Sequence, residues 1–252
     1  MPRHSMKVGA VFCDYDGTLA RMDTSRELSR VPDELIGTLT RIAAHVPVAV
    51  VTMKDFDFIH TRVPFAAGWA CVGGLEVRLA DGRIFPSRVR IQESILEDIQ
   101  QRLPPGFAVE TKRGADGELL GLCVDWRYGT VPHDDFIQGL LRELRSRNLY
   151  VRYAPPEPFI DALAGRPDEG AAVRTLAQLL GVKGSLVYIG DSVSDNPAFD
   201  EADLGICVIH GQELLSITSR AAVQQFELHP FLTSLLLNEL EIPDDAWFFH
   251  RK

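Results

Sequence analysis

Two aspartates directly after a short apolar segment are the residues of this chain whose types and spacing most directly suggest chemistry. Asp14 and Asp16 follow the apolar residues 8–13, and Gly17 and Thr18 come next. In an extended chain, side chains two residues apart project to the same side, and two carboxylates so close repel unless a cation lies between them. A hard divalent cation with oxygen ligands relieves this repulsion, and Mg²⁺ suits such a site best where phosphate also binds. Gly17 permits a sharp turn and Thr18 offers a substrate a hydroxyl, although the same run of residues is common in ordinary turns.

Two more apolar segments lead into polar side chains. One ends at Thr52, with Lys54 two residues further on, and the other leads into Asp191 and Asp195. If the segments are parallel strands, their carboxyl ends share one edge of a sheet, where ligands bind. Each feature has a simpler interpretation, because threonine is a normal strand residue and Lys54 could be a solvated loop residue. A calcium-type loop at Asp191 would need more oxygen ligands and a glutamate at the proper spacing, which does not follow.

The elements that must position these residues are predicted in the first and last thirds of the chain. Short continuous apolar segments are typical of strands buried on both faces of a parallel sheet, and amphipathic segments between them of helices. The predicted strands are residues 8–13, 46–52, 69–72, 185–189 and 205–209. The predicted helices are residues 32–45, 55–61, 168–180, 197–202 and 231–240. This alternation predicts an α/β unit with a parallel sheet.

The middle of the chain has a different pattern, typical of an α+β unit with an antiparallel sheet. A hairpin turn is predicted at Asp81-Gly82. The predicted strands are residues 107–111, 119–126 and 149–153, and the predicted helices are residues 91–103 and 134–147. We therefore predict a discontinuous Rossmann-like core, residues 1–77 and 158–252, into which a second domain, residues 78–157, is inserted.

Composition limits the classes of partner. The chain has 252 residues and a formal net charge of −9, and 46% of its residues are hydrophobic. These values favour a folded globular protein and argue against the basic face that nucleic-acid binding needs. No apolar run reaches the length of about 18 residues typical of a membrane span. Because no Cys-x-x-Cys pair occurs, we predict reduced core thiols in a cytoplasmic protein for the four cysteines, Cys13, Cys71, Cys123 and Cys207.

The three polar motifs together resemble those of the haloacid dehalogenase superfamily of phosphotransferases. The resemblance implies that Asp14 attacks phosphorus and becomes an aspartyl phosphate, while Asp16 first protonates the leaving group and then activates water. It also implies that Thr52 hydrogen-bonds the transferring phosphoryl group. Asp14, the backbone carbonyl of Asp16 and Asp191 would bind Mg²⁺ directly, with Asp195 as an outer or water-mediated ligand. The implied chemistry is sound, because a covalent step divides one difficult displacement into two.

One position departs from the pattern of this superfamily. Where relatives with this type of insert carry a Lys-Gly pair at the start of a helix, this chain has Glu169-Gly170. Glu169 would add negative charge where phosphate should dock, although it could simply complement the positive end of its helix. Arg166 or Lys54 could replace the missing cation. If neither side chain replaces this cation, phosphatase activity would be reduced, since phosphoryl transfer depends largely on electrostatic stabilisation.

The insert resembles the large α/β caps of sugar-phosphate phosphatases, among them the trehalose-6-phosphate, mannosyl-3-phosphoglycerate and sucrose phosphatases. Three short stretches resemble cap motifs of the trehalose-6-phosphate phosphatase group, although they match these motifs only in part. The stretches lie at Glu76, at Glu110 and Lys112, and at Trp126 and Arg127. In this interpretation Glu76 and Glu110 accept hydrogen bonds from sugar hydroxyls, and Lys112 and Arg127 anchor phosphate or hydroxyls. Trp126 would stack on a sugar face. The alternative is a tryptophan in the core of the insert and charged residues that face water.

The function predicted from these residues is that of a Mg²⁺-dependent phosphomonoesterase acting on a phosphorylated sugar. The expected partner is a small sugar phosphate, with no nucleic acid and no membrane, and the sequence predicts no oligomeric state. A phosphomutase, which hands the phosphoryl group to a second sugar hydroxyl, is one alternative. A sugar-phosphate-binding protein with weakened catalysis, suggested by Glu169, is the other.

Overall fold

The protein is described by a computed structural model that covers residues 5–22, 26–211 and 215–243. Its contacts divide the chain into two units. The first comprises Met1–Arg83 and Asp168–Lys252, and the second comprises Ile84–Pro167. None of the helices in the described ranges is both long and apolar enough to cross a membrane.

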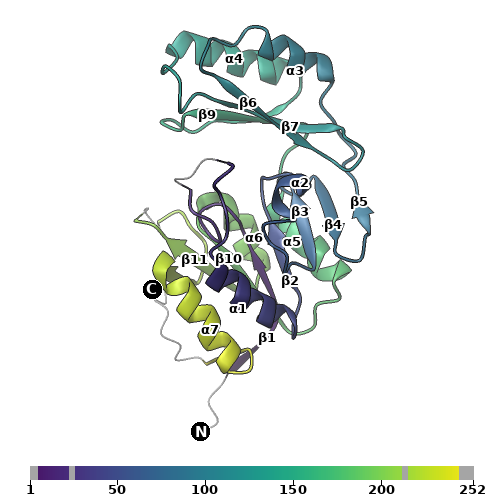
Figure 1. The fold of residues 1–252 in the computed structure, drawn as a ribbon, viewed down its shortest axis with the longest axis vertical. Helices are drawn as coiled ribbons and strands as arrows, with labels where there is room; N and C mark the ends of the chain where they lie inside the picture. Colours follow the sequence, from purple (N-terminus) through teal and green to yellow (C-terminus); the bar gives the residue numbers. More distant parts are fainter. Residues whose placement is uncertain (1–4, 23–25, 212–214, 244–252) are drawn as a thin grey trace. The chain divides into compact units, whose positions relative to one another are not determined.

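The first unit is built on a mostly parallel sheet (Figure 1). Its strand order is β12-β11-β10-β1-β2-β3-β4. The parallel strands are β1 (Ser5–Cys13), β2 (Val48–Val51), β3 (Gly68–Cys71), β10 (Ser185–Gly190), β11 (Leu204–Ile209) and β12 (Ala221–Gln224). The antiparallel additions are β4 (Glu76–Leu79) beside β3 and β13 (Glu241–Pro243) beside β1, while the short strand β5 (Ile84–Phe85) belongs to the second unit. The central strands are apolar and buried on both faces, as a parallel sheet covered by helices requires.

Helices cover the sheet of the first unit. Helices α5 (Glu169–Leu179) and α6 (Asn196–Glu201) pack on one face, where Val173, Leu176 and Phe199 join strand residues in a buried cluster. Helices α1 (Asp33–Ala43) and α7 (Leu228–Leu237) lie side by side (Figure 1). The short helix α2 (Phe56–Ile59) follows β2. These layers leave the loops after the strands free to carry functional groups.

The second unit is a four-stranded antiparallel sheet with two helices on one face (Figure 1). Its strand order is β6-β7-β9-β8. The strands are β6 (Ala108–Arg113), β7 (Leu119–Asp125), β8 (Tyr150–Arg152) and β9 (Phe159–Leu163), and the helices are α3 (Glu93–Gln100) and α4 (Asp134–Ser146). One side of the sheet forms a hydrophobic cluster with the helices, so the opposite side is left for polar residues.

The predicted fold class, a parallel α/β core with an inserted antiparallel α+β unit, is confirmed. The boundaries of the two units differ from those predicted. The boundary placed after residue 77 cuts β4, which is paired with β3 along its length. The boundary placed after residue 157 assigns β9 to the core, whereas β9 pairs with β7 and β8 in the second unit. Sequence patterns had also not predicted β9, β12 or β13.

Candidate active site

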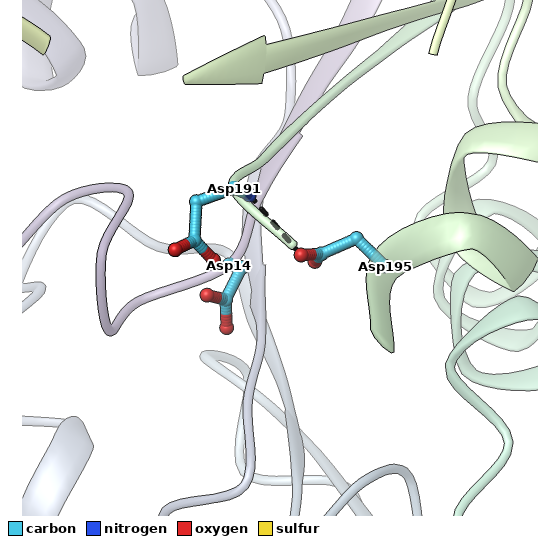
Figure 2. A group of neighbouring side chains, drawn as sticks. All are labelled: Asp14, Asp191 and Asp195. Carbon is cyan, nitrogen blue, oxygen red and sulfur yellow. Dashed lines mark hydrogen bonds between the residues drawn. The ribbon is translucent and has the colours of Figure 1, made fainter. Parts of the chain in front are cut away.

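Three carboxylates from distant parts of the chain meet at the carboxyl edge of the core sheet. Asp14 directly follows β1, Asp191 follows β10, and Asp195 ends the short 3₁₀ helix η1 (Val193–Asp195). Each contributes a carboxylate oxygen, and these oxygens all lie within 4.8 Å of one another (Figure 2). The neighbouring parallel strands hold this geometry, because the backbone N–H of Asp14 donates to the carbonyl of Ile189 at 2.8 Å. The proximity expected from the strand ends is therefore present.

Two glycines allow the carboxylates to pack against the backbone. Gly17 has a φ of +80°, and a Cβ at this position would lie 2.2 Å from Oδ2 of Asp191. A Cβ at Gly190 would lie 2.5 Å from the carboxyl carbon of Asp195. Any side chain at either position would therefore displace a carboxylate, so both glycines act as cradles for acidic groups.

Donors from β10 and from the loop that follows it orient Asp195. The Tyr188 hydroxyl donates to Oδ1 at 2.8 Å, and the backbone N–H groups of Asp191 and Ser192 donate to Oδ2 at 3.1 and 2.9 Å. The Ser192 hydroxyl donates to Oδ2 as well, at 3.2 Å. Burial raises the pKa of Asp195, and these hydrogen bonds oppose that effect. Asp195 thus anchors the loop that carries Asp191. This use of its carboxylate fits an outer or water-mediated metal ligand better than a direct one.

The electrostatics of Asp14 favour a cation at this edge of the sheet. Burial raises the pKa of Asp14 well above its ordinary value, and the charges of Asp195, Asp191, Glu169 and Asp16 raise it further. A carboxylate among four others is stable in its charged form only when a positive group compensates them. Closely spaced carboxylate oxygens are the donors that Mg²⁺ prefers, so the residues present fit a hard divalent ion.

Thr52 and Lys54 lie where the sequence suggested, at the end of β2. The Thr52 side chain is buried, and its hydroxyl accepts a hydrogen bond from the backbone N–H of Lys54 at 3.2 Å. The Lys54 ammonium lies 3.1 Å from Oδ2 of Asp16. Thr18 is buried too, and its hydroxyl has no hydrogen-bond partner among the described residues. Lys54 therefore supplies positive charge beside the second aspartate.

Glu169 is a buried residue of the site rather than a surface group. It is the first residue of α5, whose N-cap Asp168 accepts a hydrogen bond from the backbone N–H of Ala171 at 2.8 Å. Glu169 is 9% exposed, and its charge contributes to the raised pKa of Asp14. The position where the superfamily pattern has a cation thus carries an additional negative group. Arg166 is exposed and belongs to the other unit, so its role stays a prediction.

Two residues predicted to bind substrate have structural roles instead. Trp126 is 4% exposed and packs with Phe107 and Tyr153 in the hydrophobic cluster of the second unit. Its ring is therefore covered by protein and cannot stack on a sugar. Glu76 is 1% exposed and its carboxylate accepts from Nε of Arg78 at 2.7 Å, so β4 uses it in a buried ion pair of the first unit.

The remaining predicted substrate ligands lie on the second unit. The Lys112 ammonium donates to Oδ1 of Asp161 at 2.9 Å, and both side chains are buried. Glu110 is partly exposed on the same strand as Lys112. Arg127 is partly exposed and its Nε lies 2.8 Å from Oδ2 of Asp125. Glu110 and Arg127 thus remain accessible, whereas Lys112 is held by an internal partner.

His210 is a residue of the site that the sequence interpretation missed. It directly follows β11, and its Nε2 makes a hydrogen bond with the carbonyl oxygen of Gly17. The same nitrogen lies 3.8 Å from Oδ2 of Asp191. The rule that found the aspartates, a polar residue at the end of a buried strand, would also have selected His210.

Solved structures with a similar architecture define the class of fold. The crystal structure of a trehalose-6-phosphate phosphatase related protein matches with a TM-score of 0.74 at 18% identity, over 92% of this chain and 98% of that chain. The C-terminal domain of trehalose-6-phosphate phosphatase from C. albicans matches with a TM-score of 0.72 at 14% identity, over 93% of each chain. A sugar phosphatase of subclass IIB of the haloacid dehalogenase superfamily matches with a TM-score of 0.62 at 13% identity, over 92% and 100%. The chain has the fold of the haloacid dehalogenase superfamily, which confirms the resemblance.

Curated relatives are similar to the chain in sequence at 25% and 28% identity. No family model matches the chain. Trehalose-phosphate phosphatase from Mycobacterium marinum is 25% identical over 243 residues, which is 86% of this chain and 60% of the relative. Trehalose-phosphate phosphatase from Mycobacterium avium is 28% identical over 207 residues, 76% of this chain and 50% of the relative. The chain thus spans about half to three fifths of the length of these curated relatives.

Proposed function

We propose that the protein is a Mg²⁺-dependent phosphomonoesterase that hydrolyses a phosphorylated sugar through an aspartyl phosphate. The observation that carries the proposal is the meeting of Asp14, Asp191 and Asp195 beside the ion pair of Lys54 with Asp16. The names of the sequence relatives and fold neighbours, which are sugar or trehalose phosphatases, support the same class of substrate. The four cysteines are buried and form no disulfide among the described residues, which fits the cytoplasmic location that we keep as part of the proposal.

Asp14 and Asp16 divide the chemistry between them. An Asp14 oxygen attacks phosphorus, a new O–P bond forms, and the bond to the sugar oxygen breaks while Asp16 gives that oxygen a proton. Asp16 then takes a proton from water, whose oxygen attacks phosphorus and releases phosphate from Asp14. The proton balance is closed, since Asp16 ends the cycle protonated as it began.

The metal would be held by Asp14, Asp191 and the backbone carbonyl of Asp16, with Asp195 orienting the Asp191 loop. When bound, Mg²⁺ would neutralise charge on the phosphoryl oxygens and on the carboxylates. The Thr52 hydroxyl would hydrogen-bond a phosphoryl oxygen.

Lys54 is our candidate for the cation that Glu169 replaces, because its ammonium already lies 3.1 Å from Asp16. Arg166 is the second candidate. Gly17 would let the phosphoryl group approach the backbone, Thr18 would offer its hydroxyl, and Glu110 and Arg127 would contact the sugar.

The decisive experiment measures phosphate release by the full chain from trehalose 6-phosphate, glucose 6-phosphate and 6-phosphogluconate with Mg²⁺. Asp14→Asn should lower kcat/KM at least about 10³-fold, because the amide cannot form the covalent intermediate. Asp200→Asn is the matched control, since Asp200 is an exposed aspartate of α6 with no part in the site. Hydrolysis that survives undiminished in Asp14→Asn would end the assignment.

Glu169 favours a second candidate function, a sugar-phosphate-binding protein with weak catalysis. Its buried negative charge beside Asp14 opposes the docking of a phosphate dianion. Glu169→Lys restores the superfamily pattern, and a gain in turnover of more than about tenfold would favour this candidate. A loss of turnover in Glu169→Lys would instead show that this chain uses its glutamate.

A further inference from the structure

Helices α3 and α4 of the second unit border a pocket that the proposed function does not use. Its volume is about 220 Å³, and the apolar part of its lining consists of Ile99, Leu103, Phe136 and Leu140. All of the lining lies in α3, in α4 or within three residues after α3, so the pocket belongs to the helical layer of the second unit (Figure 1). Because an apolar cavity of about 150 Å³ holds one benzene molecule, this pocket has room for roughly nine carbon atoms.

The packing of the second unit holds the walls of this pocket in place. Ile99 and Leu140 belong to the hydrophobic cluster of the unit and are 1% and 8% exposed. The Phe136 ring meets the Phe107 ring edge-on, with 5.6 Å between the ring centroids. Ligand sites are typically such concave, mostly apolar and largely preformed spaces. The pocket therefore does not need a ligand in order to form.

Gly139, in the interior of α4, keeps the pocket open. Glycine is among the least favourable residues inside a helix, so its presence there calls for a reason. Close packing does not supply one, because a Cβ at Gly139 would have no atom within 4 Å apart from its chain neighbours and the backbone of its own helix. Since Gly139 lines the pocket, a larger side chain at this position would occupy the space that a ligand needs.

The charged part of the lining, Arg102 and Glu143, favours an anion. The Arg102 side chain is 56% exposed, its Nε donates to the carbonyl of Asp98 at 2.8 Å, and its guanidinium also donates to Oε1 of Glu143. Arg147 donates to the same oxygen of Glu143 at 3.0 Å. Because Arg147 would still compensate Glu143, the Arg102 guanidinium can turn to a ligand without leaving that carboxylate unpaired. A bound cation would instead place a third positive group beside Glu143.

The charge of the surrounding segments points the same way. Residues 98–103 and 139–147 carry most of the lining and have a formal charge of +2. Their charged residues are Arg102, Arg142, Arg145 and Arg147 against Asp98 and Glu143. An anionic ligand lowers this surplus and a cationic ligand raises it, so the pocket complements an apolar molecule with one negative group.

We propose that the pocket between α3 and α4 binds a small monocarboxylate with an aromatic or branched apolar body. The body contacts the apolar walls beside Gly139, and the carboxylate pairs with Arg102, whose planar guanidinium suits a bidentate contact. This site is separate from the proposed phosphatase site and does not depend on the proposed function, because its lining includes none of the residues assigned to that reaction.

Three matched compounds test the class of ligand. 3-Phenylpropionate, 3-phenylpropan-1-ol and 3-phenylpropylamine share a ring and a chain and differ in the charge of the end group. Calorimetry with the full chain should give a dissociation constant below about 1 mM for the acid, at least about threefold higher for the alcohol and higher again for the amine. The preference for the acid should shrink as KCl increases, because Arg102 is more than half exposed. No saturable binding of the acid up to about 10 mM, or equal binding of the acid and the alcohol, would overturn the proposal.

Substitutions at Gly139 locate the ligand. Gly139→Leu should raise the dissociation constant of the acid at least about tenfold and leave the melting temperature unchanged or higher, because leucine favours a helix and fills the pocket. Gly139→Ala is the control, since it stabilises the helix but adds only one methyl group, and it should bind the acid within about threefold of the wild-type protein. Undiminished binding by a folded Gly139→Leu would place the acid elsewhere and overturn the proposal.

Substitution of Arg102 tests the contact with the carboxylate. Arg102→Gln should bring the dissociation constants of the acid and the alcohol to within about twofold of each other. Arg174→Gln is the matched control, because Arg174 of α5 is similarly exposed and also pairs with a glutamate, and it should keep the whole preference. An unchanged preference in Arg102→Gln would overturn the role of Arg102. Dimers of the wild-type protein that Gly139→Leu abolishes would assign the pocket to a second copy of the chain and would also overturn the proposal.

Discussion

The acidic edge of the core and the charged side of the second unit bury their charges in opposite ways. At the core edge, carboxylate oxygens of Asp14, Asp191 and Asp195 lie within 4.8 Å of one another. In the second unit, the Lys112 ammonium lies 2.9 Å from the Asp161 carboxylate and the pair is buried. Like charges raise each other's pKa and require a ligand from outside, whereas an opposite pair compensates itself. The first arrangement fits an external cation, and the second holds strands of the second unit together.

The largest expected effect comes from making Asp14 neutral. Asp14→Asn should abolish turnover and at the same time raise the stability of the metal-free protein by about 1–2 kcal/mol, because it removes a charge from a group of five carboxylates. Thermal denaturation in EDTA, with Asp200→Asn beside it, measures the gain. A lower melting temperature in Asp14→Asn would show that the carboxylates of the wild-type protein do not repel one another.

The same group predicts how stability depends on pH. The pKa of Asp14 lies above its ordinary value in the folded protein. In the pH interval between these two pKa values, the folded state therefore binds more protons than the unfolded state. The contribution is fully present below the ordinary pKa of aspartate and is lost as the pH rises through the raised pKa. Stability of the metal-free protein should therefore fall over this interval, and Asp14→Asn should lose that part of the dependence. Denaturant titrations at several pH values provide the measurement.

The next effect is expected in the second unit. Lys112→Met leaves the Asp161 carboxylate buried without its cation and should cost about 3–5 kcal/mol of unfolding free energy. The double variant Lys112→Met with Asp161→Leu removes both charges and should recover most of this loss. Urea denaturation of the four proteins in the cycle measures the coupling. A double variant as unstable as Lys112→Met would mean that the pair does more than compensate its own charges.

The difference between the two regions also explains what the sequence could predict. Asp14, Thr52 and Asp191 each follow an apolar strand, and parallel strands bring their carboxyl ends to one edge, so a local pattern predicts a shared site. The partnership of Lys112 with Asp161 joins residues 49 positions apart on β6 and β9, which flank β7 in the sheet, and β9 itself was not predicted. No local pattern encodes such a pairing, because it depends on the order of the strands in the sheet.

Burial explains the other differences between the predicted and the observed roles of residues. The sequence allowed Trp126 to be either a sugar platform or a core residue, and the choice depends on Phe107 and Tyr153, which come from different segments. Glu169 was open in the same way, because the sequence allowed it either to complement the positive end of its helix or to add negative charge at the site. Both questions concern packing between elements, which periodicity within one element does not contain.

A smaller effect is expected when a divalent ion is added. The core edge should bind Mg²⁺ and gain about 2.7 kcal/mol of stability at a concentration 100 times the dissociation constant. Melting curves with Mg²⁺, with the Asp14→Asn and Lys112→Met variants alongside, test the contrast. The shift should disappear in Asp14→Asn and persist in Lys112→Met, since only the first removes a proposed ligand. An equal shift in both variants would place the ion elsewhere.

The smallest effect is expected at Trp126, and it separates packing from binding. Trp126→Phe keeps an aromatic ring in the cluster with Phe107 and Tyr153 but removes part of its volume, so it should cost about 1 kcal/mol of unfolding free energy. A ring covered by protein contributes nothing to sugar stacking, so KM for the substrate that proves best should not change. An increase in KM of more than about threefold with little loss of stability would restore the sugar-stacking role, because a substrate contact changes binding without changing the core. The variant thus tests whether the second unit uses its large aromatic ring, like its buried ion pair, to hold its own elements together.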